Sequence, residues 1–227
     1  MSVGRENEAI QSLQTISRFN RKDLELKNLR MSENTKDLPL TPKTAIKEIT
    51  LSEDGVLRYN VIICTILWTG TTFSQYLASY TLKNLPGDFY KNIYASTSSE
   101  VAAILLSGIF ASQFNFKSTL IFGYILAFVS GFFVTTNPFE SETIFAFFVL
   151  LSRFGVCITF NMNYVAVQRL FPSVVLSTVF GITNVFARFI TVLAPMIAER
   201  PEPQPMALFT SIMLLCSVIV TLLDTKK

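Results

Sequence analysis

Histidine is absent from the 227 residues of this chain, and cysteine and charged residues are scarce. Without histidine, catalysis by a Ser-His-Asp or Cys-His set is excluded, as are most zinc and haem sites. The three cysteines, Cys64, Cys157 and Cys216, lie in three different apolar runs with no CxxC spacing, so we interpret them as small hydrophobic residues. No phosphate-binding loop or metal-ligand cluster occurs in the sequence. We therefore predict that the protein is not an enzyme, and no cofactor is implied.

Charged residues make up 15% of the chain and apolar residues 50%, and more than half of the charged side chains precede Asn60. The sequence that follows contains apolar runs long enough to cross a bilayer, for which about 20 residues are needed. We therefore predict an all-α polytopic membrane protein. The net charge is only +3 and no basic patch interleaved with aromatic residues occurs, so no nucleic-acid partner is expected.

Six transmembrane helices are predicted, separated by short turns rich in proline, glycine or asparagine. They are expected at about 57–82, 92–114, 118–136, 143–168, 174–198 and 206–223. Residues 1–56 are predicted to form a polar arm containing a short amphipathic helix with the apolar stripe Ala9, Ile10, Leu13 and Ile16, and residues 224–227 a short tail. No cleavable signal peptide is expected. Basic residues are more frequent on the side of the arm, so both termini are predicted to be cytosolic.

Two arginines fall inside predicted spans, Arg153 in the fourth and Arg188 in the fifth. An arginine at the centre of a membrane helix costs about 2.5 kcal/mol or more, so such residues usually have a function. At helical spacing each arginine shares a face with other polar or small residues. The two faces consist of Arg153, Cys157, Asn161, Tyr164 and Gln168, and of Gly181, Asn184, Arg188, Thr191 and Pro195. We predict that both faces border water rather than lipid.

Polar residues are also concentrated on the first two spans, whereas the third and sixth contain no charge and few hydroxyl groups. Four helices are therefore expected to line an aqueous cavity and two to face lipid. The polar residues of the first two spans are Thr65, Thr69, Thr72, Tyr76 and Ser79, and Ser96, Ser99, Glu100 and Ser107. Two alternatives remain open. Small and hydroxyl-bearing residues are also typical of close helix packing, and Glu100 can pair with one arginine as a structural bridge, which leaves the other arginine unexplained.

Several short motifs mark the individual spans. They are Trp68 with Phe73, Gln75 and Tyr76; Glu100-Val101-Ala102-Ala103; Arg153-Phe154-Gly155; Leu170-Phe171-Pro172-Ser173; and the segment from Gly181 to Pro195. Together they resemble the C-terminal six-helix half of a major facilitator superfamily transporter, in the organic cation and anion branch of the solute carriers. The resemblance covers nearly the whole chain. It implies transport of small organic ions by alternating access, with the solute bound between two six-helix halves.

The resemblance makes Arg188 the most informative position, because members that handle organic anions tend to carry arginine at the matching place. One acid and two bases in the predicted cavity also favour an anionic solute. The substrate-binding residues are predicted to be Arg188, Glu100, Arg153, Tyr76, Asn161, Tyr164 and Asn184. Trp68, Phe73 and Phe160 are expected to add flat apolar contacts to an organic body.

The chain also departs from the family pattern at the cytosolic ends of the helices, where family members carry an ion-pair network that gates the cavity. Lys117 and Arg169 are the predicted gating residues, although Lys117 is the one base retained in its loop and Arg169 stands where a glutamate is expected. Because the motifs match one half of the fold, we expect a second six-helix half within the lipid bilayer, from a homodimer or a separate chain. The plasma membrane is favoured over an organelle membrane.

Two hypotheses follow. In the first, the chain is a half-size transporter of small organic ions, with anions favoured. In the second, it is a structural membrane subunit of a larger complex, derived from a transporter fragment that has lost its gating charges because nothing moves. An incomplete gene model or a pseudogene is a third interpretation. The native mass of the chain extracted gently from its membrane would separate the first two.

Overall fold

The computed structural model describes Gln11, Thr15, Ser17, Arg18 and residues 55–84, 88–136, 141–201 and 203–223. The chain divides into two compact units, Met1–Pro39 and Leu40–Lys227. In the first unit the four described residues are helical, and the Thr15 hydroxyl donates a hydrogen bond to the Gln11 carbonyl over 2.9 Å. The predicted stripe Ala9, Ile10, Leu13 and Ile16, most of the predicted arm 1–56, and the tail 224–227 lie outside the described residues.

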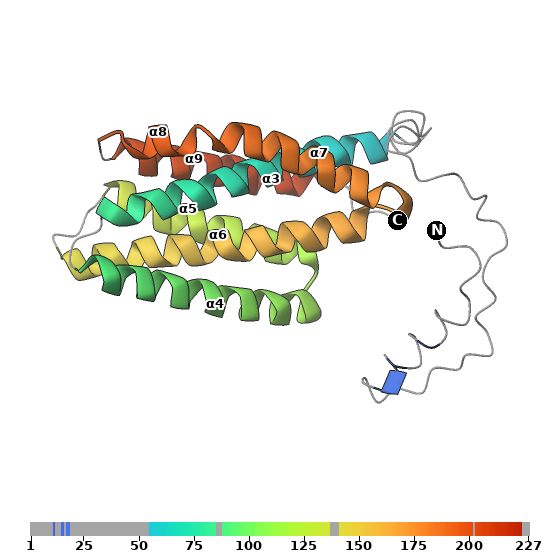
Figure 1. Cartoon of the computed structure of the whole chain (residues 1–227), viewed down its shortest axis with the longest axis horizontal. Coiled ribbons are helices and arrows are strands. Elements are labelled where there is room, and N and C mark those ends of the chain that lie inside the picture. Colours follow the sequence, from blue (N-terminus) through green and yellow to red (C-terminus); the bar gives the residue numbers. More distant parts are fainter. Residues whose placement is uncertain are drawn as a thin grey trace. The chain divides into compact units, whose positions relative to one another are not determined.

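The described part of the second unit consists of helices joined by short connections (Figure 1). The helices are α3 (Val56–Thr81), η2 (Leu82–Asn84), α4 (Phe89–Gln113), α5 (Phe116–Thr136), α6 (Glu142–Leu170), α7 (Ser173–Thr191), α8 (Ala194–Ala198), α9 (Gln204–Ile219) and η3 (Val220–Leu222). Within the ranges that the structure describes, six helical segments are long and apolar enough to cross a membrane. The structure therefore confirms the predicted all-α membrane fold with six spans.

The fifth span is interrupted, whereas the sequence pattern predicted one helix over 174–198. Helix α7 ends at Thr191, and α8 begins at Ala194 after a turn at residues 192 and 193. Pro195 is the physical reason, because it has no N–H to donate to the carbonyl four residues before it, and its ring crowds that carbonyl. The Ile197 N–H instead donates to the Leu193 carbonyl, over 3.2 Å, and restarts the helix. The two helices together form one span, Val175–Ala198.

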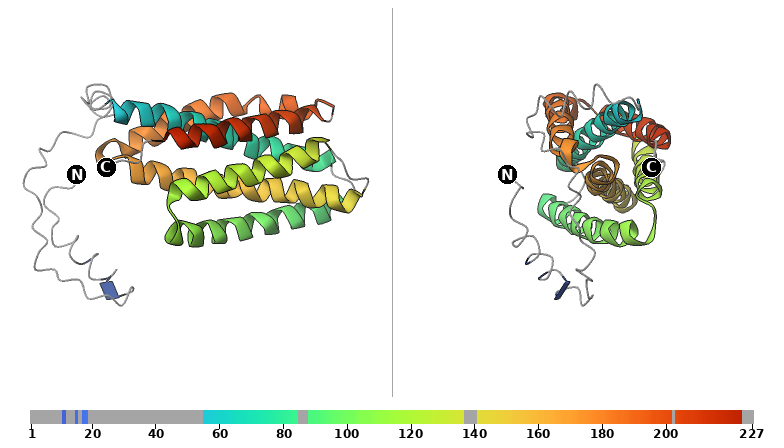
Figure 2. Two further views of the ribbon diagram at one scale, coloured as in Figure 1. Left: turned by 180° about the vertical axis from the view of Figure 1, so that it is seen from behind. Right: turned by 90° about the vertical axis from the view of Figure 1, so that its right-hand side faces the viewer.

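The spans pack around two central helices, α3 and α6 (Figure 2). Helix α3 contacts α6, α7, α8 and α9, and α6 contacts α4 and α5 as well as α3. Helix α5 also lies along α9. Helix α4 is the least covered span, because only 17% of the apolar stretch that would cross the membrane is buried. The span formed by α7 and α8 is next, with 28%. These two spans therefore present the largest uncovered faces of the described unit.

Small residues bring α5 and α6 into backbone contact. A Cβ atom placed on Gly155 of α6 would lie 2.8 Å from the Ala127 nitrogen and 3.0 Å from the Gly123 carbonyl oxygen, both on α5. Membrane helices associate through close packing rather than through the hydrophobic effect, so small residues dominate their tightest contacts. The packing of these two helices therefore depends on the absence of a side chain at Gly155.

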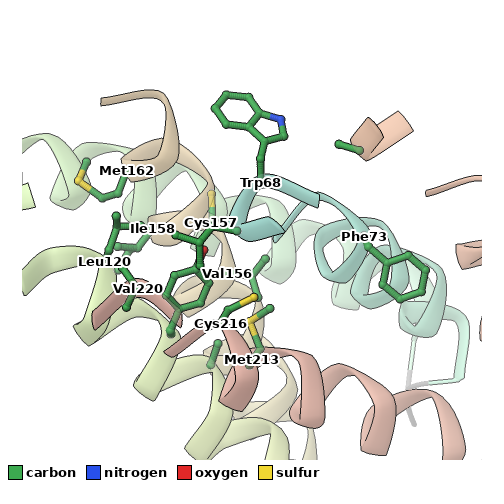
Figure 3. Close-up of a cluster of buried hydrophobic side chains, with 14 of the residues drawn as sticks. Trp68, Phe73, Leu120, Val156, Cys157, Ile158, Met162, Met213, Cys216 and Val220 are labelled. Atoms are coloured by element: carbon green, nitrogen blue, oxygen red, sulfur yellow. The ribbon is translucent and has the colours of Figure 1, made fainter. Parts of the chain in front are cut away.

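The core of the bundle is apolar and includes sulfur-containing side chains from α6 and α9 (Figure 3). Met162, Met213 and Cys216 are each at most 2% exposed. Cys64 and Cys157 are also buried, and all three cysteines are free thiols. The interpretation of the cysteines as small hydrophobic residues agrees with their position in the structure.

Candidate functional site

Arg153 links three spans inside the bundle, through an ion pair and a hydrogen bond. Arg153 of α6 donates through Nη2 to the Glu100 carboxylate of α4, and through Nη1 to the Ser79 hydroxyl of α3 over 3.0 Å. The Arg153 side chain is 5% exposed and that of Glu100 27%. The third nitrogen of the guanidinium group, Nε, is buried and has no partner. Arg153 is thus neutralised by one carboxylate but not saturated with hydrogen bonds.

The second intramembrane arginine has a different environment. Arg188 of α7 is exposed, and its Nη1 donates to the Tyr76 hydroxyl of α3 over 2.5 Å. Its guanidinium carbon also lies 5.6 Å from the centre of the Tyr76 ring, within the range of a cation–π contact. Among the described residues no carboxylate pairs with Arg188. Glu100 therefore forms its bridge with Arg153, and within the described ranges no carboxylate compensates the charge of Arg188.

The partners of the two arginines are neighbours on α3. Tyr76 and Ser79 are three residues apart, which places them on adjacent parts of one helical face at levels about 4.5 Å apart along the axis. Arg153 reaches this face from α6 and Arg188 reaches it from α7. The structure thus brings the predicted residues Tyr76, Glu100, Arg153 and Arg188 to one region of the bundle.

An aromatic cluster is formed by residues of α3, α6 and α7, farther along α3. The Trp68 ring of α3 is 4.5 Å from that of Tyr164 on α6 and 5.6 Å from that of Phe180 on α7, with edge-to-face geometry in both cases. Phe160 is 5.4 Å from Tyr164. Helices α3 and α7 run in parallel with constant register, since Tyr76 and Arg188 are 112 residues apart, as are Trp68 and Phe180. The cluster therefore lies about 12 Å along α3 from the Arg188 contact.

The remaining predicted binding residues make local contacts. The amide groups of Asn161 and Asn184 each donate to the carbonyl four residues earlier, at Cys157 and Phe180, over 2.9 Å. Both side chains are half-buried and keep their amide oxygens for other partners. Phe73 was expected to contact a solute, but it is 4% exposed and belongs to the core (Figure 3), so it offers no surface for one.

The two predicted gating residues contact helix ends and rings. Lys117, in the first turn of α5, donates to the carbonyls of Thr221 and Leu223 over 2.8 and 2.7 Å. Those carbonyls lie at the end of the last described span, and the lysine supplies donors to them. The guanidinium group of Arg169, at the end of α6, lies 5.8 Å from the Phe116 ring. Neither residue contacts a carboxylate among the described residues.

A buried polar triad was missed by sequence reasoning. Asn163 of α6 donates to the hydroxyls of Thr71 on α3 and Tyr124 on α5, over 3.0 and 3.3 Å, and those two hydroxyls are 2.7 Å apart. Thr71 donates its own proton to the Leu67 carbonyl, so Tyr124 is the donor to Thr71. Helix α5 was expected only to face lipid, but Tyr124 carries a polar group into the core. The signal available in the sequence was a tyrosine in a span that has no charge and only scattered hydroxyl groups.

We expect Tyr124→Phe to lower the stability of the bundle by about 1 kcal/mol, the usual size of a hydrogen bond between membrane helices. The substitution removes the donor to Thr71 and the acceptor of Asn163 but leaves the ring in place. The measurement is the apparent melting temperature of the purified protein in mild detergent. Tyr94→Phe is the matched control, because that ring is 71% exposed on α4. Equal melting temperatures for the two variants would contradict a stabilising role for the triad.

No protein-family model matches the chain. Among curated proteins, it is 24% identical to human (Homo sapiens) solute carrier family 22 member 13 over 98% of this chain and 40% of that protein. It is 24% identical to organic cation/carnitine transporter 2 of Rattus norvegicus over 61% of this chain and 25% of the relative. Solute carrier family 22 member 4 of Mus musculus is 28% identical over 59% of this chain and 24% of the relative.

The chain thus spans less than half the length of each of these relatives. The comparisons agree with the family that the motifs indicated, and six helices without strands among the described residues agree with one half of its fold. The chain is a multi-pass membrane protein similar to the organic cation and carnitine transporters of solute carrier family 22, in the major facilitator superfamily.

Proposed function

We propose that this protein takes part in the transport of small organic ions across a membrane by alternating access, with a preference for anions. The observation that supports an anion is the state of Arg188. It is an exposed arginine within a membrane span, and no carboxylate compensates it among the described residues. An intramembrane charge is costly unless a partner neutralises it, so an anionic solute is the natural partner.

The neighbouring side chains support the same assignment. Tyr76 holds the guanidinium group of Arg188 by a hydrogen bond and a ring contact, which limits the orientations of its remaining donors. Within the aromatic cluster, Tyr164 would face the organic body of the solute, since it remains 38% exposed, whereas Trp68 is 2% exposed and supports Tyr164 from the core. A solute with an acidic group and an apolar body suits these two features.

The name of one relative, organic cation/carnitine transporter 2, specifies organic cations and carnitine. Carnitine joins a carboxylate to a quaternary ammonium group, so an arginine is a suitable partner for one end of it. A simple cation has no such group and would be repelled by Arg188. The experiment therefore compares an organic anion, carnitine and a quaternary ammonium cation.

Transport also requires a closed cavity, and we propose that a second set of six helices covers the faces of α4 and α7. Those helices would be supplied by a homodimer or by a separate polypeptide. Transporters built from two such halves bind the solute between them, and one half rocks against the other to open the site to each side of the membrane in turn. The plasma membrane, with both termini cytosolic, is the proposed location.

The test is Arg188→Gln, assayed for uptake of radiolabelled benzoate, carnitine and tetraethylammonium by proteoliposomes made from the gently extracted protein with its co-purifying chains. We expect wild-type uptake of benzoate or carnitine and at least a tenfold loss in the variant, because the fixed charge is removed while the glutamine keeps donors. Arg200→Gln is the control, since Arg200 is exposed beyond the end of α8. Uptake of tetraethylammonium alone would contradict the anion assignment.

A second candidate function is that of a structural subunit in a larger membrane complex. Lys117 supports it, because this expected gating base is engaged by two backbone carbonyls at the end of the last span rather than by an acid. The native mass of the gently extracted protein tests this candidate. A homodimer or a pair with another six-helix chain favours transport, whereas a large assembly of unrelated chains favours the structural role.

A further inference from the structure

Two arginines reach neighbouring residues of α3, and one of them is paired with a carboxylate of α4. Arg188 contacts Tyr76, and Arg153 contacts Ser79 one turn farther along the helix. Glu100 is the acid that binds Arg153. Away from the helix ends, the charged side chains of the six described spans are these three, Glu100, Arg153 and Arg188. The region therefore has a net charge of one positive unit while Glu100 is ionised.

We infer that Glu100 determines the valence of the solute, so that the site takes singly charged organic anions in preference to doubly charged ones. This inference rests on the proposed function. By binding Arg153, Glu100 leaves the charge of Arg188 as the one that a solute can neutralise. One carboxylate of the solute compensates that charge, whereas a second carboxylate would lie in the same region as Glu100 and would have no cation to pair with. Repulsion between like charges is strong in a low-dielectric membrane protein, so the dianion is disfavoured.

The geometry around Arg153 is suited to such a role. Its Nε is buried, and among the described residues the Glu100 carboxylate is the one acid paired with this guanidinium group. Glu100 is partly exposed and lies on α4, the least covered span, so its side chain borders the uncovered part of the bundle. Neutralising Glu100 would therefore leave a second uncompensated guanidinium charge in the region of α3 that Arg188 also reaches. The site would then suit a dianion.

The experiment measures the affinities of benzoate and terephthalate, a monoanion and a dianion built on one ring, together with the matched pair biphenyl-4-carboxylate and biphenyl-4,4′-dicarboxylate. Binding is followed by calorimetry on the gently extracted protein with its co-purifying chains. Wild type is expected to prefer the monoanion of each pair. In Glu100→Gln the ratio of dianion to monoanion affinity is expected to rise at least tenfold, because the amide oxygen still accepts from Arg153 but carries no charge.

Three further variants make the result decisive. Glu100→Ser is a second neutral variant, since α4 already buries serine at positions 96 and 107, and it should show the same rise if Glu100→Gln folds poorly. Glu199→Gln removes an acid at the end of α8 and should leave the ratio unchanged. In Glu100→Gln combined with Arg153→Gln, one positive charge remains, so the monoanion preference should return.

The outcomes separate this inference from the proposed function. If wild type binds neither monoanion, the proposed anion site itself is wrong. If wild type binds a monoanion and the neutral variants keep the wild-type ratio, the anion site stands and the role of Glu100 is overturned. A rise that persists after Arg153 is also replaced would likewise overturn it, because the second cation would then lie elsewhere.

Discussion

Arg153→Leu is expected to destabilise the bundle more than any other single substitution of a polar residue in it. The change leaves the Glu100 carboxylate inside the membrane region with no cation, and removes the hydrogen bond to Ser79. Removing one partner of a buried ion pair costs about 3–5 kcal/mol, and the partial exposure of Glu100 places this case near the lower value. We expect a large fall in the apparent melting temperature and in the yield of monodisperse protein in mild detergent.

The same ion pair makes a rescue prediction. Arg153→Leu combined with Glu100→Leu removes both charges, so the penalty for an unpaired carboxylate disappears, and replacing a whole buried pair by apolar residues is often neutral. The double variant is therefore expected to be more stable than Arg153→Leu alone. Arg200→Leu serves as the control because that arginine is exposed. Similar melting temperatures for Arg153→Leu and Arg200→Leu, or no recovery in the double variant, would show that the pair does not hold the helices.

Gly155→Val is expected to separate α5 from α6. A Cβ atom at this position would meet the nitrogen, at 2.8 Å, and the Cα atom, at 3.1 Å, of Ala127, and these are backbone atoms that cannot rotate away. Overpacking costs about 1–3 kcal/mol where side chains can adjust, and more is expected where two backbones must move apart. Because α5 also contacts α9, a shift of α5 disturbs both interfaces. The measurements are the melting temperature and the elution profile of the purified variant.

Two comparisons isolate the steric effect. Gly155→Ala adds only the first carbon and should cost less than valine but still lower the melting temperature. Gly181→Ala on α7 is the matched control, because no heavy atom lies within 4 Å of its added Cβ. At Gly181 the greater helix propensity of alanine should leave stability unchanged or raise it by up to about 1 kcal/mol. If Gly155→Ala behaves like Gly181→Ala, the close contact between α5 and α6 does not limit stability.

The number and type of the spans were predictable because the apolar runs are long and charges inside them are rare. The importance of Glu100, Arg153 and Arg188 was predictable for the same reason, since an ionisable group stands out in an apolar run. Which of the two arginines pairs with Glu100 could not be predicted, because it depends on which helices are neighbours. Arg153 lies on α6, which contacts α4, whereas Arg188 lies on α7, which packs along α3.

Other features could not be predicted because they are distances between residues far apart in the chain. The contact between Lys117 and the carbonyls of Thr221 and Leu223 spans more than 100 residues. From sequence alone, a lysine that forms a gating ion pair cannot be distinguished from one that binds the end of another helix. The triad of Thr71, Tyr124 and Asn163 joins three spans with one residue from each. The break at Pro195 differs from these features, because proline is a local signal for it, yet the sequence pattern was interpreted as one helix over 174–198.

The position of α3 also affects the order of membrane insertion during synthesis. This helix is made first among the six described spans, yet its neighbours α6, α7, α8 and α9 are all made later. Until they emerge from the ribosome, buried polar groups such as Thr71, whose interhelical partners Tyr124 and Asn163 lie on later spans, have no completed interface. Gly70 acquires its close neighbour Cys216 only when the last span is inserted. The packing around α3, the first of the described spans to be made, is therefore completed only when the last of them has been inserted.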